Sequence, residues 1–251
     1  MNRLESQLQR LYRLPAATPG EALISAQGEV RALVLELARP ADWAALSPVW
    51  RGVQADLQLP APAIAVSGTD GLQLWFSLQQ PVSSTRAAAF LAQLRAQYLP
   101  GIAPSRVRAM PTSTGPTWQA PLVPAPQAGT ENWSAFVAPD LAPVFADTPW
   151  LDIPPSAEGQ ADLLAPLQSI KPAALDTAMQ RLPAGVPAPA APAAPAAPAL
   201  PALPAVEPPA AGAAGTTPDV SPRHFLQRVL NDETVALALR VAAATALLKH
   251  P

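Results

Sequence analysis

Residues 63–78 read AIAVSGTDGLQLWFSL, and this stretch carries the clearest structural signal in the chain. Two short apolar runs flank Gly68-Thr69-Asp70-Gly71. An Asp-Gly pair between such runs predicts a β-hairpin, because the turn needs residues that tolerate positive φ. In the second run apolar and polar residues alternate, as in a strand with two different faces. One face is predicted to carry Leu72, Leu74, Phe76 and Leu78, and the other Gln73, Trp75 and Ser77.

Upstream of the hairpin, the pattern predicts a strand followed by a helix. Residues 31–37 (RALVLEL) form a short apolar run with a lone Glu36, which is typical of a buried strand. Pro40 lies where the next helix is expected to begin, with Asp42 in its first turn to complement the helix dipole. Apolar residues then recur every three or four positions, as on a helix that packs against a sheet: Trp43, Leu46, Trp50, Val53 and Leu57.

Downstream of the hairpin, a second helix and a fourth strand are expected. Pro81 is predicted to end the preceding strand, and Ser83 or Ser84 can cap the helix. The apolar face of that helix comprises Phe90, Leu91, Leu94 and Tyr98. Residues 106–110 (RVRAM) are predicted to form the fourth strand. The order β-α-β-β-α-β over residues 31–110 predicts an α+β fold with an RRM-like, or ferredoxin-like, core, in which two helices cover one face of an antiparallel sheet.

The segments on either side of this core are predicted to complete one domain, residues 1–182. Leu4, Leu8, Leu11 and Tyr12 lie at helical spacing and predict a short amphipathic helix at the N-terminus. Between 111 and 182, large aromatic residues are expected to wrap the chain onto the core: Trp133, Phe136, Phe145 and Trp150. Two short helices are expected at 161–170 and 173–182.

Beyond the domain, residues 183–218 are rich in alanine and proline and nearly lack charged and aromatic residues. Such a composition cannot bury enough area to fold, so it predicts a disordered linker. Residues 219–251 predict a pair of short helices, the first beginning at Ser221-Pro222 and the second capped by Asp232. A segment of about thirty residues seldom buries enough surface to be stable alone. Residues 221–250 are therefore expected to dock onto the main domain, a partner protein or a second copy.

The composition excludes several chemistries. The chain has no cysteine, so it has no disulfide, thiolate zinc site or cysteine nucleophile. Its two histidines, His224 and His250, lie beyond the linker, which leaves the domain without an imidazole for general base catalysis, metal ligation or a catalytic triad. The formal net charge of -2 gives no basic surplus. Because no signal peptide or membrane span is evident, we expect a cytoplasmic protein with no membrane partner.

Residues 67–74 (SGTDGLQL) resemble the Ser-Gly-x-x-Gly-x-His-aliphatic hairpin of archaeo-eukaryotic primase-type polymerases, and most of all its form in the polymerase domain of bacterial end-joining ligases. The resemblance covers residues 31–110, and that family is built on an RRM-like core. In the family the hairpin holds the phosphates of the incoming nucleotide. The resemblance therefore implies that Ser67, Gly68, Gly71 and Gln73 contact a ligand.

The sequence departs from that family where catalysis would be carried out. Gln73 stands in place of the histidine that contacts phosphate, and it cannot carry a positive charge. The first strand has one acidic residue, Glu36, where the family has a pair that holds two metal ions, and residues 106–110 lack the third acid. Two-metal phosphoryl transfer needs several carboxylates within a few ångströms. The resemblance therefore implies a catalytically inactive relative without a metal site or cofactor.

The C-terminal segment carries a second resemblance. Residues 221–248, with Ser221-Pro222, Phe225-Leu226, Asn231-Asp232 and Leu247-Leu248, are similar to a helix pair in phage terminase small-subunit-like proteins. This resemblance implies an association with nucleic acid only in general terms.

Three functions remain open from the sequence. The first is a non-catalytic binding or adaptor protein that contacts nucleic acid or a nucleotide. In it Trp75 stacks on a base, as sheet aromatics do in RNA-binding modules, or instead packs beneath the 111–182 segment, and Arg106 and Arg108 contact phosphate. The second is a divergent primase-polymerase or nucleotidyltransferase that uses Glu36, Asp70 and one further acidic residue with Mg²⁺. The third is a protein–protein scaffold without a nucleic-acid role.

Overall fold

The computed structural model describes residues 2–15, 23–112 and 118–183. The chain divides into two compact units, Met1–Ala194 and Pro195–Pro251, and all described residues belong to the first. Its elements in chain order are α1 (Arg3–Leu11), β1 (Glu29–Ala38), α2 (Trp43–Ala55), β2 (Ala63–Val66), β3 (Gly71–Ser83), α3 (Ser84–Tyr98), the 3-10 turn η1 (Pro104–Arg106), β4 (Val107–Met110), β5 (Ala135–Val137), the 3-10 turn η2 (Ala142–Phe145), α4 (Ala157–Leu164) and α5 (Pro172–Arg181).

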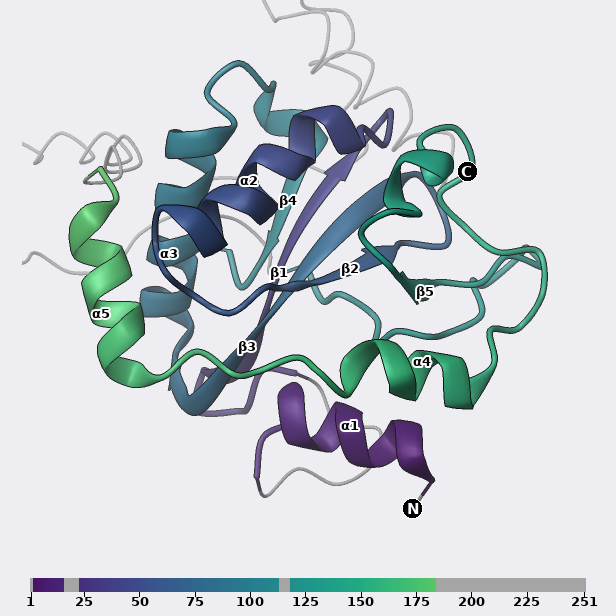
Figure 1. The fold of residues 1–251 in the computed structure, drawn as a ribbon, viewed down its shortest axis with the longest axis horizontal. Helices are drawn as coiled ribbons and strands as arrows, with labels where there is room; N and C mark the ends of the chain where they lie inside the picture. Colours follow the sequence, from purple (N-terminus) through teal and green to yellow (C-terminus); the bar gives the residue numbers. More distant parts are fainter. Residues whose placement is uncertain (1, 16–22, 113–117, 184–251) are drawn as a thin grey trace, which may run out of the picture. The chain divides into compact units, whose positions relative to one another are not determined.

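The five strands form one sheet in the order β4-β1-β3-β2-β5, and every neighbouring pair is antiparallel (Figure 1). The two long strands, β1 and β3, lie at its centre, with Leu35 opposite Leu74 and Glu36 opposite Gln73. The α+β class with an antiparallel sheet is therefore confirmed. The residues 111–182 that were expected to wrap onto the core contribute β5 to the edge of this sheet.

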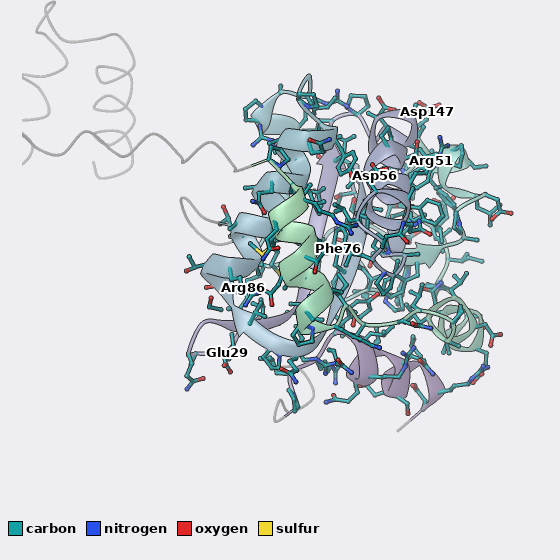
Figure 2. The ribbon with its side chains drawn as sticks, turned by 60° about the vertical axis from the view of Figure 1, so that its left-hand side comes forward. Glu29, Arg51, Asp56, Phe76, Arg86 and Asp147 are labelled. Carbon is teal, nitrogen blue, oxygen red and sulfur yellow. The ribbon has the colours of Figure 1, made fainter. Side chains whose placement is uncertain are left out.

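One face of the sheet is covered by α2, α3 and α5 (Figure 1), and an apolar cluster fills the layer between them. The odd-numbered residues of β1 from Leu33 onward and the even-numbered residues of β3 up to Leu78 point into this layer, and for β3 this is the face that the alternation predicts: Leu33, Leu35, Leu37, Leu72, Leu74, Phe76 and Leu78. The helices add the apolar stripes expected for them, including Leu46, Val53, Phe90 and Leu94. Phe76 lies in the interior and contacts Phe90 edge to face, with 6.0 Å between the ring centroids (Figure 2).

The opposite face of the sheet is covered by α1, by residues 118–124 and by α4. It carries the other side-chain set of the same strands, with Trp75, Ala32 and Val34 in an apolar cluster with Tyr12 and Phe136. The aromatic rings of Tyr12 and Phe136 lie 5.3 and 6.0 Å from that of Trp75. Both faces are thus buried. A core with helices on only one face would leave the other exposed, and here α1, residues 118–124 and α4 cover that other face.

Side-chain caps begin the helices where the sequence indicates them. Asn2, Asp42 and Ser83 each accept a hydrogen bond from a backbone amide in the first turn of α1, α2 and α3. Asp42 is therefore the N-cap of α2 and not a residue of its first turn, and the helix begins three residues after Pro40. The expected helix at 161–170 lies earlier, at Ala157–Leu164, capped by Ser156.

Two local predictions about the hairpin strands are wrong. Pro81 does not end β3, which continues to Ser83. The pairing register with β1 shifts between Val30 and Ala32, so Pro81 falls in the irregular stretch where no amide donor is required. The positive φ of the turn, 82°, belongs to Gly68 and not to the Asp70-Gly71 pair.

The linker predicted at 183–218 and the helical pair predicted at 219–251 lie outside the described residues, apart from residue 183. Within the described part of the chain, no helix is both long enough and apolar enough to cross a membrane.

Candidate functional site at the 67–71 hairpin

The turn between β2 and β3 is closed by the hydroxyl of Ser67. Its Oγ accepts hydrogen bonds from the backbone amides of Thr69, at 3.1 Å, and Gly71, at 2.9 Å. The amide of Gly68 donates to the carbonyl of Pro149 at 2.9 Å. Gly68 also needs its positive φ and lacks room for a side chain, because a Cβ would lie 2.6 Å from Gln127.

The resemblance to primase-type polymerases implies that this hairpin holds phosphate groups. In the structure, the amides of Gly68, Thr69 and Gly71 donate within the protein. Ser67 and Gly71 are also buried. These three backbone donors are therefore not presented to a ligand, and any ligand at the hairpin must be held mainly by side chains.

A buried polar network runs across the three strands next to the hairpin. The indole Nε1 of Trp75 donates to the Gln73 side-chain oxygen at 2.8 Å, and the Gln73 amide nitrogen donates to Glu36 at 2.7 Å. The other carboxylate oxygen of Glu36 accepts from Arg108 at 3.1 Å. Glu36, Gln73 and Trp75 are all buried, whereas the side chain of Arg108 is 36% exposed. The network therefore leads from the core to a guanidinium at the surface.

Burial raises the pKa of Glu36 above its ordinary value of 4.5. The hydrogen bond from Gln73 and the charge of Arg108 act in the opposite direction. Asp70 and Arg39 lie close enough to contribute smaller effects of opposite sign to this pKa. Glu36 is thus a buried carboxyl group whose charged form depends on two neighbouring donors.

Arg108 lines an open pocket beside the hairpin, with a volume of about 540 Å³. The other lining residues come from the turn itself and from the loop that precedes β5: Gly68, Thr69, Asp70, Thr130 and Asn132. The guanidinium of Arg108 also lies over the ring of Trp118, 5.9 Å from its centroid. Arg39 adds a second exposed guanidinium, 4.0 Å from Asp70. The pocket wall therefore offers one anchored cation, one carboxylate and neutral hydrogen-bonding groups.

The remaining predicted site residues lie elsewhere. Trp75 is 0% exposed, so its ring has no free face for stacking on a base, and its packing against Phe136 agrees with the alternative that it lies beneath the 111–182 segment. Arg106 donates to the backbone carbonyls of Ala38 and Pro40, which ties β4 to the end of β1. Of the seven predicted ligand-binding residues, Gly68 and Arg108 line the pocket.

Several residues of the pocket were not predicted from the sequence. Thr130 and Asn132 follow Gly129, whose positive φ of 78° marks a turn, and Asn132 donates to Thr130 within that turn. A turn signal was present in the sequence, but nothing in it indicates that this loop approaches the hairpin some sixty residues earlier. The sequence shows Trp118 as an aromatic residue but gives no indication that it contacts Arg108.

The polymerase alternative requires a Mg²⁺ site at Glu36 and Asp70. The residues present do not fit such a site, because both oxygens of Glu36 accept hydrogen bonds from Gln73 and Arg108 and a guanidinium occupies the position next to the carboxylate. Among residues 2–15, 23–112 and 118–183, no three acidic or histidine side chains converge as possible metal ligands.

No protein-family model matches this sequence. No curated protein matches it at a significant level. The geometry of the hairpin pocket is therefore the basis for assigning a function.

Proposed function

We propose that this protein is a non-catalytic binding protein with an RRM-like core that contacts single-stranded nucleic acid or a nucleotide through Arg108. The succession β1-α2-β2-β3-α3-β4, with both connecting helices on one face of an antiparallel sheet, supports an RRM-like core. A cytoplasmic location belongs to the same proposal.

The observation that carries the proposal is the way Arg108 is held. Glu36 binds one of its nitrogens, the Trp118 ring lies 5.9 Å from it, and it lines an open pocket of about 540 Å³. A guanidinium positioned by a buried carboxylate loses less conformational freedom when it binds a phosphate. Arg39 lies 4.0 Å from Asp70, a lining residue of the pocket, and supplies a second positive charge nearby.

The proposed contact differs from that of ordinary RRM modules. Those proteins stack bases on aromatic residues of an open sheet face. Here that face is covered by α1, α4 and residues 118–124, and Trp75 is buried. The proposed ligand therefore lies at the end of the sheet, where the hairpin and β4 meet, and is held through phosphate rather than through stacked bases.

The environment of Glu36 supports a non-catalytic role. A carboxyl group that is buried, raised in pKa and bonded to Arg108 and Gln73 is poorly suited to bind Mg²⁺. The divergent polymerase alternative predicts nucleotide incorporation that depends on Mg²⁺ or Mn²⁺. Incorporation by the wild-type protein that is lost on Glu36→Gln substitution would overturn the non-catalytic proposal.

Fluorescence anisotropy with labelled single-stranded DNA and RNA oligonucleotides at low salt tests the binding proposal. We expect binding that weakens with added salt and that falls about tenfold on Arg108→Ala substitution, because one charge-assisted contact is lost. The matched control is Arg51→Ala, which removes an exposed arginine of α2 and should leave the affinity unchanged. An equal loss in both variants would indicate a nonspecific charge effect and would contradict the proposal.

The scaffold alternative makes the opposite prediction for the same measurement. A protein that acts only through its C-terminal segment should bind neither oligonucleotide nor mononucleotide at low salt. That result would remove the proposed role of Arg108. The predicted docking of residues 221–250 on a partner or a second copy remains a separate proposal, outside the described residues.

A further inference from the structure

The carboxyl group of Glu36 lies next to the guanidinium that lines the hairpin pocket. Glu36 is 1% exposed, and its Oε1 accepts a hydrogen bond from Nη1 of Arg108 at 3.1 Å. Arg108 lines the pocket, and its side chain is 36% exposed. A guanidinium has five N–H donors, so the donors that Glu36 does not engage remain for a ligand. A phosphate at Arg108 would therefore share one guanidinium with a buried carboxylate.

Four ionised side chains at this end of the sheet form two balanced pairs. Arg108 is paired with Glu36, and Arg39 lies 4.0 Å from Asp70, which lines the pocket. The charges of the two arginines favour the ionised form of Glu36, whereas the charge of Asp70 opposes it. These two pairs have no net positive charge, so one added phosphodiester would leave one negative charge without a partner.

The other segments near Glu36 offer no cation for that extra charge. On β3, the neutral Gln73 donates to Oε2 of Glu36 at 2.7 Å. Residues 118–124, which cover this face of the sheet, contain no charged side chain. Glu131, on the loop that borders the pocket, is acidic and exposed. The charged side chains of residues 2–15 bond to one another, to α4 or to backbone carbonyls: Arg3, Glu5, Arg10 and Arg13.

A phosphate bound at Arg108 changes the ionisation of a carboxyl group this close to it. Two negative charges about 7 Å apart repel each other strongly enough at a protein surface to favour the neutral carboxyl by at least about tenfold. Burial already raises the pKa of Glu36, because a low-dielectric environment disfavours the charged form. Both effects act in the same direction, so the protonated carboxyl group is the form that is compatible with a bound phosphate.

We propose that Glu36 takes up a proton when a phosphate group of the ligand binds Arg108, so that pH regulates the affinity of this pocket. Glu36 is then a positioning residue, whose carboxylate holds Arg108 at the pocket in the free protein. On binding, the guanidinium exchanges the carboxylate for the phosphate as its anionic partner. A proton from solvent forms the O–H bond of Glu36, which keeps the total charge of the site unchanged. This inference rests on the function proposed for the Arg108 pocket and adds its regulation.

The composition of the domain makes this regulation measurable. Histidine is the side chain that ordinarily titrates between about pH 5 and 8, and the only two in the chain, His224 and His250, lie outside the described residues. A carboxyl group with a raised pKa is therefore the expected source of pH-dependent binding in this window. Because the phosphate favours protonated Glu36, affinity should be highest at low pH and should fall as the pH rises.

Fluorescence anisotropy with labelled oligothymidylate and the full-length protein tests the inference between about pH 5 and 8 at fixed ionic strength. Neither the bases nor the phosphodiesters of this probe titrate in that range. We expect the affinity of the wild type to fall about tenfold as the pH rises. Glu36→Gln cannot take up a proton and should bind with an affinity that changes little with pH. The matched control, His224→Gln with His250→Gln, should keep the wild-type profile.

Asp70→Asn provides a second variant, at an exposed position of the turn. Because the charge of Asp70 raises the pKa of Glu36, its removal should shift the fall in affinity to lower pH without abolishing it. A shift to higher pH would contradict the inference.

Isothermal titration calorimetry of the wild type needs no variant. Repeated at about pH 6 in buffers of different ionisation enthalpy, it should show net proton uptake, of up to about one proton per bound phosphate group. Binding without proton uptake, or equal pH profiles for the wild type and Glu36→Gln, would overturn the inference and leave the proposed function intact. No binding of the oligonucleotide or of a mononucleotide at any pH would overturn both.

Discussion

The two faces of the sheet are built on the same strands but are held by different interactions. On the face covered by α2, α3 and α5, the strands present aliphatic side chains and Phe76. On the opposite face, Glu36, Gln73, Trp75 and Ser77 each make a hydrogen bond to a specific group. Ser77, for example, donates to the carbonyl of Leu11 in α1 at 2.6 Å.

This difference means that substitutions on the two faces should be tolerated differently. Apolar packing is non-directional and accepts residues of similar volume. A buried polar group needs its own partner at hydrogen-bond distance, and loses stability when that partner is removed. The face covered by α2, α3 and α5 therefore contributes mainly non-directional burial. The opposite face adds buried hydrogen bonds to its apolar cluster, and these fix which distant segments cover it and lead to the pocket at Arg108.

The largest expected effect comes from two neighbouring aromatic residues, one on each face. Phe76→Ala should lower the free energy of unfolding by about 3–5 kcal/mol through lost burial. Trp75→Ala should lower it at least as much, because it removes more volume and also leaves the buried oxygen of Gln73 without its donor. Urea unfolding followed by circular dichroism measures both. A much smaller loss for Trp75→Ala would show that the face opposite α2, α3 and α5 contributes little to the stability of the fold.

A smaller effect is expected at the sheet edge. The side-chain amide of Gln160 makes both hydrogen bonds that a neighbouring strand would make with Phe136. Gln160→Leu should cost about 1–3 kcal/mol for the unsatisfied backbone groups, and should increase self-association because the edge of β5 is no longer covered. Urea unfolding and sedimentation velocity test the two effects. Ser156→Ala, at the cap of the same helix, controls for destabilised α4 without exposing the edge.

The smallest effect is a change in pH dependence. Because burial raises the pKa of Glu36 above 4.5, the folded state binds more protons than the unfolded state between pH 4.5 and the raised value. The free energy of unfolding of the wild type should therefore fall as the pH rises through this window. Glu36→Gln cannot lose a proton and should show a shallower fall. Parallel pH profiles for the two proteins would contradict the burial of a titrating carboxyl group.

Much of the fold could be predicted because it depends on local patterns. Alternation assigned the residues of β3 to the correct faces, and residue type alone narrowed the cap of α3 to Ser83 or Ser84, of which the structure uses Ser83. Pro81 was misjudged because its effect depends on the pairing of β1 opposite it, and that register shift has no local signal. At Gly68, an added Cβ would lie 2.6 Å from Gln127, a residue far along the chain whose approach has no local signal either.

The candidate site could be predicted only in part. Glu36, Gln73 and Arg108 attract notice as polar residues in strand segments, and the structure brings all three into one network. Thr130 and Asn132 could not be identified, because they reach the pocket from a loop outside the predicted core. Trp75 was predicted either to stack on a base or to pack beneath the 111–182 segment, and its burial against Tyr12 and Phe136 agrees with the second alternative.

The sequence by itself determined the strand and helix periodicities, the chemistries that a chain without cysteine and with two distal histidines excludes, and the apolar face of the sheet. These follow from spacing and composition, which act over a few residues. Only the tertiary structure decided that the second face is buried, that Arg108 lies at a pocket, and that an apolar groove lies between β2, β5 and α4. Those outcomes depend on contacts between residues far apart in the chain, and no local pattern encodes which distant segment will supply a hydrogen-bond partner.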